Sequence, residues 1–159
     1  MLRSTASLLR RLLPRWGRLG SLSWAERRVV AESFALLPLA HWALRVRGLQ
    51  EFRARLVRDG RRRRSAAPLD ARRVAELVEA TARVIPAPSN CLQRSGAVAW
   101  MLVRHGVQPD LRIGVRKVEG ALQFHAWVEV DGEVINDASD VGGRYTPFGG
   151  STPPNATFT

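Results

Sequence analysis

SNCLQRSGAVAWMLVRHGV, residues 89–107, is the stretch that decides the fold which this sequence predicts. Ser89 and Asn90 are both favourable N-cap residues, so a helix is expected to begin at Cys91. Apolar side chains then recur at helical spacing, and Gly106 lies where a glycine commonly ends a helix. The one cysteine of the chain is therefore expected in the first turn of a helix.

A cysteine in this position is a candidate nucleophile. A thiol attacks as the thiolate, and the free backbone N–H groups at a helix N-terminus lower its pKa. The same N–H groups are placed to stabilise the oxyanion of a tetrahedral intermediate. The alternative is a small buried cysteine that packs the turn and does no chemistry. Both interpretations of Cys91 stay open on position alone.

Downstream of this helix the periodicity of the sequence changes to two, which is typical of strands. Residues 111–115 alternate apolar and polar side chains, and the runs 121–130 and 133–138 flank the hairpin signal Asp131-Gly132. Helices followed by antiparallel strands predict an α+β fold, with the helix that begins at the cysteine packed on an antiparallel sheet.

His125 lies within the second of these predicted strands. Because side chains alternate along a strand, it shares a face with Trp127 and Glu129. A histidine there is either the base that activates Cys91 or a core residue with a satisfied ring. The order of a helix-start cysteine, a strand histidine and then an acid is that of papain-like and transglutaminase-like enzymes.

The length of the hairpin loop decides whether Asp137 can orient His125. A two-residue loop, residues 131–132, turns Asp137 to the wrong strand face, because a shift of one residue inverts every side chain. A three-residue loop, residues 130–132, sets His125 opposite Asp137. We predict the three-residue loop or an equivalent bulge.

Other polar residues compete for this third role. Glu129 shares the face of the histidine but belongs to the same strand, and Asp140 falls beyond the strand end. Asn136 is expected to face away. Ser95 and Arg94, one turn into the helix, are expected to pack or orient and not to react. The predicted catalytic residues are therefore Cys91, His125 and Asp137.

The part of the chain before this region is predicted to be helical. From Ser23 to about Val57 the apolar spacing indicates two packed helices, with a boundary at Pro38, an interruption near Gly48 and arginines on the outer face. Asp70 is a favourable N-cap for a further helix. The expected organisation is a basic helical N-terminal extension (1–60), a catalytic core (68–148) and a flexible tail (149–159). The sequence is rich in Gly, Pro and Thr from Gly142 onward, so this stretch is expected to be loose.

The charge of the chain is unevenly distributed. Residues 1–73 hold 18 Lys and Arg against 5 Asp and Glu, whereas residues 74–159 hold 7 against 9. The basic half is either a surface for an acidic partner or simply a set of solvated helix faces. The first twenty residues have the composition of a mitochondrial presequence, and a short amphipathic helix that docks on a partner or a membrane surface fits them equally well.

The composition also limits the class of protein. A single cysteine allows no intramolecular disulfide and fits a reducing compartment, so we expect a cytoplasmic protein. No apolar run reaches the roughly 18 residues that span a bilayer. One cysteine and three scattered histidines give no metal-ligand spacing, so no metal and no cofactor are expected.

The stretch from residue 89 to residue 137 resembles a known family, the leader peptidases of lasso peptide biosynthesis, which are bacterial transglutaminase-like proteins. The likeness covers about residues 86–140 and depends on a set of motifs and not on any one of them. They are Cys91-Leu92-Gln93-Arg94-Ser95, Ile113-Gly114-Val115, His125-Ala126-Trp127-Val128-Glu129 and Asp137. Phe124 stands where the family often has alanine.

The resemblance implies a cysteine protease with a transglutaminase-like core that cuts a precursor peptide between leader and core. It implies a split system with a separate leader-recognition protein, since residues 1–60 read as helix and leave no room for a fused recognition domain with strands. A separate ATP-dependent macrolactam cyclase then closes the ring and is a further candidate partner. The bacterial family also argues against a mitochondrial presequence.

Two other functions stay open beside this interpretation. The first is a different transglutaminase-like amide hydrolase or acyltransferase, because the triad alone does not define the substrate. The second is a non-enzymatic basic module that binds nucleic acid through residues 1–73, although with the family resemblance no nucleic acid is expected. Contact with a membrane surface has no specific support in the sequence.

Overall fold

The computed structural model describes residues 22–62, 69–85 and 89–147. The basic first twenty residues, most of the arginine-rich connector and the predicted tail lie outside these ranges. The elements are α2 (Trp24–Arg62), α3 (Ala71–Ala82), α4 (Cys91–Arg104), β1 (Asp110–Val118), β2 (Ala121–Val130), β3 (Glu133–Val134), α5 (Val141–Arg144) and β4 (Thr146–Pro147). The predicted α+β fold is confirmed.

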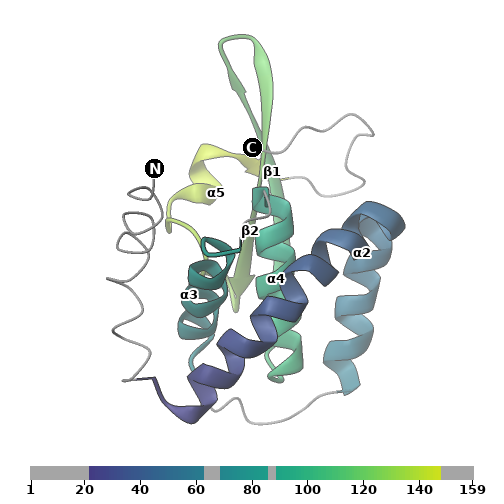
Figure 1. Ribbon diagram of the computed structural model, residues 1–159. Coiled ribbons are helices and arrows are strands. Elements are labelled where there is room, and N and C mark those ends of the chain that lie inside the picture. The colour runs from purple at the N-terminus through teal and green to yellow at the C-terminus, as the bar shows by residue number, and fades with distance from the viewer. Residues whose placement is uncertain (1–21, 63–68, 86–88, 148–159) are drawn as a thin grey trace, which may run out of the picture.

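The four strands form one antiparallel sheet in the order β3-β2-β1-β4. Helices α2, α3 and α4 pack together over one face of it, and the β1–β2 hairpin projects beyond them (Figure 1). The main core joins these helices to sheet residues Leu111 and Val128. A second cluster, Trp127, Val134, Val141 and Tyr145, brings together residues of β2, β3 and α5.

Helix α2 begins as predicted, and the predicted interruption near Gly48 is confirmed, whereas the predicted boundary at Pro38 is not. The Ser23 and Glu26 side chains each accept a hydrogen bond from the other residue's backbone N–H, which is a capping box. The predicted boundary at Pro38 is wrong, because the helix continues through it and is interrupted at Gly48, whose φ is 75°. Pro38 is exposed, so the carbonyl that loses its donor there lies on the solvent side, where water can satisfy it.

The predicted arginine-covered outer face of α2 is also wrong in part. Between residues 29 and 44, every exposed side chain is apolar. These side chains are Ala31, Phe34, Ala35, Pro38, Leu39 and Trp42. Arginines stand only at the two ends of this stretch, where Arg27 and Arg45 are exposed. The helix therefore presents an apolar outer face between two basic ends.

The last described part of the chain is more ordered than the sequence predicted. Residues from Gly142 onward were expected to be loose, yet Val141–Arg144 form the short helix α5 and Thr146–Pro147 pair with β1. Val141 and Tyr145 are buried against Trp127, which supplies the apolar contact that fixes this segment. The glycine content of this segment suggested a loose chain, but the burial of Val141 and Tyr145 orders it.

Candidate active site

The sequence-predicted nucleophile lies where expected, in the first turn of α4. Asn90 forms a capping box with Gln93, which fixes the start of the helix at Cys91. Cys91 is only 3% exposed and packs against Ile113 of β1 and Ala126 of β2. The thiol is thus held between the helix start and the strand that carries His125.

The electrostatics of the thiol differ from the expectation. Burial raises the pKa of Cys91 above its ordinary value, although hydrogen bonds from the backbone of Ala126 and Leu92 and the charge of Arg94 act in the opposite direction. The expected lowering by the helix N-terminus is therefore outweighed. In this arrangement Cys91 is a neutral thiol that needs a base before it can attack.

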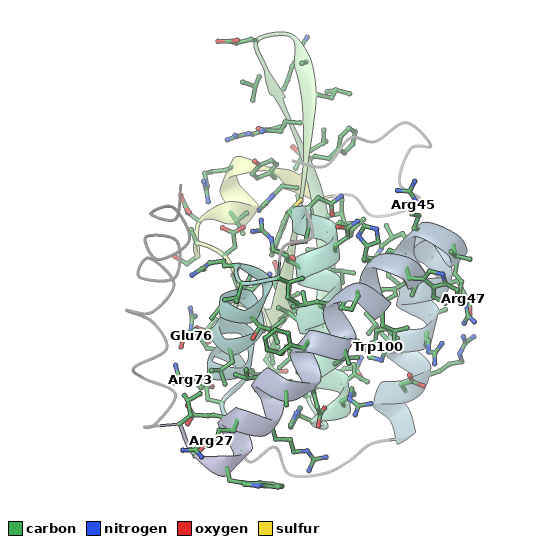
Figure 2. The ribbon with its side chains drawn as sticks, in the orientation of Figure 1. Arg27, Arg45, Arg47, Arg73, Glu76 and Trp100 are labelled. Carbon is green, nitrogen blue, oxygen red and sulfur yellow. The ribbon has the colours of Figure 1, made fainter. Side chains whose placement is uncertain are left out.

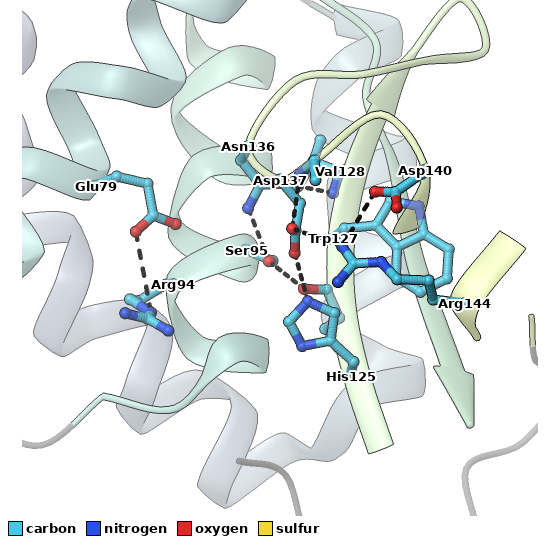
Figure 3. Close-up of polar contacts among 12 residues, drawn as sticks. Glu79, Arg94, Ser95, His125, Trp127, Val128, Asn136, Asp137, Asp140 and Arg144 are labelled. Atoms are coloured by element: carbon cyan, nitrogen blue, oxygen red, sulfur yellow. Dashed lines mark hydrogen bonds and ion pairs between the residues drawn. The ribbon is translucent and has the colours of Figure 1, made fainter. Parts of the chain in front are cut away.

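The structure brings the other two predicted residues together. His125 Nε2 and Asp137 Oδ2 form a hydrogen bond, and both side chains are partly exposed (Figure 3). The imidazole also stacks on Tyr145, with ring centroids 5.0 Å apart, and more loosely on Trp127. Because Asp137 takes Nε2, the nitrogen that is left for a proton exchange is Nδ1.

The link between this pair and the cysteine runs through neighbouring residues. Within the described part of the chain, no hydrogen bond joins the Cys91 thiol to His125. The contact is made one residue further along, where Ala126 packs on Cys91. His125 is therefore next in sequence to the residue that packs on the thiol, and the thiol and the imidazole are not hydrogen-bonded to each other.

The predicted hairpin register is wrong. Val130 pairs with Glu133, so the loop has two residues, and both Asp131 and Gly132 have positive φ, as a type I′ turn requires. Continued pairing would set Asp137 opposite Ala126, on the face away from His125. Asp137 nevertheless reaches the histidine because β3 ends at Val134 and the chain leaves the sheet.

Asn136, which was expected to face away, takes part in this departure. Its Oδ1 accepts a hydrogen bond from the backbone N–H of Val128 at 2.7 Å, and its Nδ2 donates to Ser95 Oγ at 2.9 Å. Ser95 in turn donates to the Ala126 carbonyl at 2.9 Å and is almost fully buried. The only sequence signal for this role of Asn136 was its polar side chain within the short predicted strand 133–138.

The competing acids are occupied by other partners. Glu129 accepts from Trp127 Nε1 at 2.8 Å and from Arg112 Nε at 3.0 Å, so it holds the sheet surface. Asp140 pairs with Arg144 at 3.3 Å. Asp137 remains the acid that contacts His125, and Arg144 also lies 3.8 Å from its second oxygen.

Gly114, from the Ile-Gly-Val motif, lies opposite His125 in the β1–β2 pairing. A methyl group built on it would meet Tyr145 Cβ at 2.7 Å and the Trp127 ring at 2.9 Å. The aromatic side chains that flank the histidine therefore pack directly on this glycine. The motif requires glycine because no other residue leaves room for them.

A partly buried pair that the sequence did not single out lies next to the site. Glu79 on α3 approaches Arg94 on α4, with Oε2 and Nε 4.0 Å apart (Figure 3). Burial raises the pKa of Glu79, and the nearby charge of Asp137 raises it further, whereas Arg94 and a hydrogen bond from Asn136 lower it. An acid beside apolar helix positions gives too weak a signal to identify such a pair from sequence.

In residues 22–62, 69–85 and 89–147, no group of three or more His, Cys, Asp or Glu side chains is placed to hold a metal ion. One helix there, Trp24–Gly60, is long and apolar enough to cross a membrane by length and composition. A core helix passes the same test, and the inner face of α2 contributes Val29, Leu36 and Ala40 to the core.

With this geometry established, the comparison with known families identifies the class of protein. Residues 34–149 match the transglutaminase-like superfamily, so the chain belongs to that superfamily. Its members are typically enzymes of the cysteine-protease type that act on amide bonds. Searches of curated proteins and of solved structures each gave no significant match.

Proposed function

We propose that this chain is a cysteine protease that removes the leader peptide from a lasso peptide precursor. Superfamily membership supports amide chemistry, and the motif set around Cys91, His125 and Asp137 supports the finer assignment. The observation that carries the proposal is the hydrogen-bonded His125–Asp137 pair, one residue from the Ala126 that packs on a helix-start cysteine.

The proposed mechanism follows from the burial of the thiol. Because burial favours the neutral thiol, His125 Nδ1 takes the proton of Cys91 as the sulfur attacks the carbonyl between leader and core. Asp137 holds the imidazole through Nε2 and stabilises the imidazolium that forms. Backbone N–H groups at the start of α4 face the developing oxyanion.

The second half of the reaction returns each group to its starting state. The imidazolium gives its proton to the leaving amine as the C–N bond breaks, which releases the core peptide. Water then attacks the thioester, His125 accepts its proton, and the S–C bond breaks to release the leader acid. Cys91 recovers its proton, so no co-reactant besides water is needed.

We assign the apolar outer face of α2 to the separate leader-recognition protein. Trp42 is 51% exposed and Leu39 43% exposed on this face, and apolar side chains that gather on an exposed face commonly mark a protein interaction site. Arg45 and Arg47 project at one end of it (Figure 2). A second copy in antiparallel orientation would bring arginines against arginines, so an acidic partner with an apolar patch fits better.

The remaining assignments follow from the same proposal. The protein acts in the cytoplasm of a bacterium, on a ribosomal precursor, before a separate ATP-dependent cyclase closes the macrolactam. The cyclase is a second candidate partner. The domain division into an N-terminal extension (1–60), a core (68–148) and a tail (149–159) stays a prediction.

The function is tested by incubating the protein with a precursor peptide and its recognition protein, and by following leader release by mass spectrometry. Cys91→Ala and His125→Ala are expected to abolish release. Asp137→Asn is expected to reduce the rate by about 10²- to 10⁴-fold, because the histidine loses its orienting partner. Asp140→Asn is the matched control and is expected to retain activity, since Asp140 pairs only with Arg144 in the described contacts.

The same assay separates the proposal from its alternatives. Absence of leader release by the wild-type protein with both partners present would contradict the protease assignment, and turnover of another amide would favour a different member of the superfamily. Leu39→Glu is expected to weaken recognition-protein binding. Leu122→Glu, which replaces a still more exposed leucine on the β1–β2 hairpin, is not expected to weaken it. Equal binding by both variants would remove the docking assignment.

A further inference from the structure

The position of Asp137 cannot be explained by the sheet that precedes it. The pairing of Val130 with Glu133 and of Glu129 with Val134 would, if continued, set Asp137 opposite Ala126. Ala126 packs toward Cys91, whereas His125 stacks with Trp127 and Tyr145. A regular strand would therefore turn the carboxylate away from the imidazole with which it bonds.

The strand ends by exchanging a backbone acceptor for a side-chain acceptor. Ile135 still donates its N–H to the Val128 carbonyl at 3.0 Å, as in a regular ladder. The reciprocal bond is different, because the N–H of Val128 is taken by Asn136 Oδ1 at 2.7 Å and not by the Ile135 carbonyl. The main chain is thereby free to leave the sheet without a buried unpaired N–H on β2.

The orientation of the Asn136 amide is determined by its partners. Its oxygen faces a donor, so its NH₂ group faces an acceptor, Ser95 Oγ at 2.9 Å. Ser95 donates its own proton to the Ala126 carbonyl, which leaves its oxygen to accept from Asn136. The amide is thus hydrogen-bonded to both β2 and α4.

We infer that Asn136 is a positioning residue, which directs Asp137 onto His125 by replacing the main-chain hydrogen bond of β3. Ser95 supports it by fixing the amide. Neither residue contacts the reacting atoms, and both act through the orientation of the carboxylate. This inference rests on the proposed function for its catalytic meaning, but the geometry that it concerns can be measured without a peptide substrate.

The test compares Asn136→Ala with Asp137→Ala in two measurements. The first is the rate of Cys91 alkylation by iodoacetamide between pH 6 and pH 10. The second is the tautomer of His125, from its ¹⁵N chemical shifts. Loss of Asp137 removes the partner that orients His125 and is expected to slow alkylation near pH 7.5 by on the order of threefold to tenfold, since a change of one unit in the pKa of the thiol changes the thiolate fraction tenfold. Asn136→Ala is expected to slow it in the same direction and to reduce the Nε2–H tautomer.

Ser95→Ala and Ser33→Ala form the matched control pair. Both remove a buried hydroxyl, but Ser33 donates only to the Val29 carbonyl within α2, away from the site. Ser95→Ala is expected to shift both measurements in the direction of Asn136→Ala by a smaller amount, and Ser33→Ala is expected to shift neither. Near-UV circular dichroism reports whether each variant is folded.

The outcomes distinguish this inference from the proposed function. A folded Asn136→Ala variant with the wild-type alkylation profile and tautomer, while Asp137→Ala shifts both, would overturn the positioning role and leave the triad intact. If Asn136→Ala does not fold, a Ser95→Ala variant that matches Ser33→Ala overturns it. If Asp137→Ala changes neither measurement, then Cys91 and His125 are not coupled, and both the triad and this inference are rejected.

Discussion

Replacement of Gly114 by alanine is expected to damage the aromatic packing around the candidate histidine. The added methyl would lie 2.7 Å from Tyr145 Cβ and 2.9 Å from the Trp127 ring, closer than carbon atoms approach without displacement. Tyr145 Cβ cannot rotate away because it is bonded to the main chain, and Trp127 is fully buried. The strain must therefore move the backbone of α5 or β1.

The size of the effect follows from overpacking in a buried site. Forced shifts of this kind cost about 1–3 kcal/mol, which for a chain of this length lowers Tm by about 2 to 4 °C per kcal/mol. The free energy of unfolding is measured by urea titration with fluorescence or far-UV detection. Because Tyr145 stacks on His125, leader release is expected to fall as well, beyond what the loss of folded protein explains.

Gly142→Ala is the matched control for this prediction. A methyl at Gly142 meets nothing within 4 Å, and its φ lies outside the left-handed region. Since alanine is favourable in a helix, this variant is expected to be as stable as the wild type or slightly more stable. A Gly114→Ala variant that unfolds within about 0.5 kcal/mol of Gly142→Ala would refute the packing argument, because surface substitutions commonly stay within that range.

Three further predictions concern titrating groups. Because burial raises the pKa of Cys91, its alkylation by iodoacetamide is expected to be half-maximal at a higher pH than that of a free cysteine in the same assay, and a plateau below pH 7 would contradict this. Hydrogen bonds from Ser23 and Arg73 lower the pKa of Glu26 from 4.5 to about 2, so its carboxylate stabilises the fold above pH 4.5 and this contribution is lost as pH falls through about 2. Glu26→Gln should therefore lower Tm at pH 7 and leave it unchanged at pH 2. Burial raises the pKa of Glu79 above 4.5, so stability is lost as pH rises through the folded-state value, and Glu79→Gln should remove this loss in urea titrations between pH 4 and pH 7.

The start of α4 was predictable because its determinants are local. An N-cap asparagine, a glutamine three residues later and an apolar periodicity lie within one segment of sequence, and the capping box at Asn90 and Gln93 confirms them. The strand that carries His125 was predictable for the same reason, since alternation needs no partner to be visible. Both elements contribute their candidate residue at a position set by local rules.

The position of Asp137 depends on contacts that sequence periodicity does not encode. A hairpin signal allowed both loop lengths, and the choice of the three-residue loop was wrong. Asp137 still reaches His125 because the Asn136 side chain replaces a backbone acceptor, which depends on Ser95 from a different helix. The predicted contact between His125 and Asp137 therefore forms, but the cause is the Asn136 side chain and not the predicted three-residue loop.

The outer face of α2 shows a different limit of sequence patterns. Between residues 29 and 44, apolar side chains lie on both the inner and the outer side of α2, so no polar stripe marks the solvent face. The exposed positions of Leu39 and Trp42 could therefore not be distinguished from the core positions of Leu36 and Ala40. Only the packing of α2 on α3 and α4 defines which side remains open.

The three candidate residues come from separate elements, and each has a near neighbour that joins those elements. Ser95 lies one turn after Cys91, and its hydroxyl is hydrogen-bonded both to the carbonyl of Ala126, which follows His125, and to the amide of Asn136, which precedes Asp137. The helix start, the strand and the loop are thus attached to one another one step away from the reacting groups. Because these buried bonds do not change charge during the reaction, they can hold the geometry while a proton moves between thiol and imidazole.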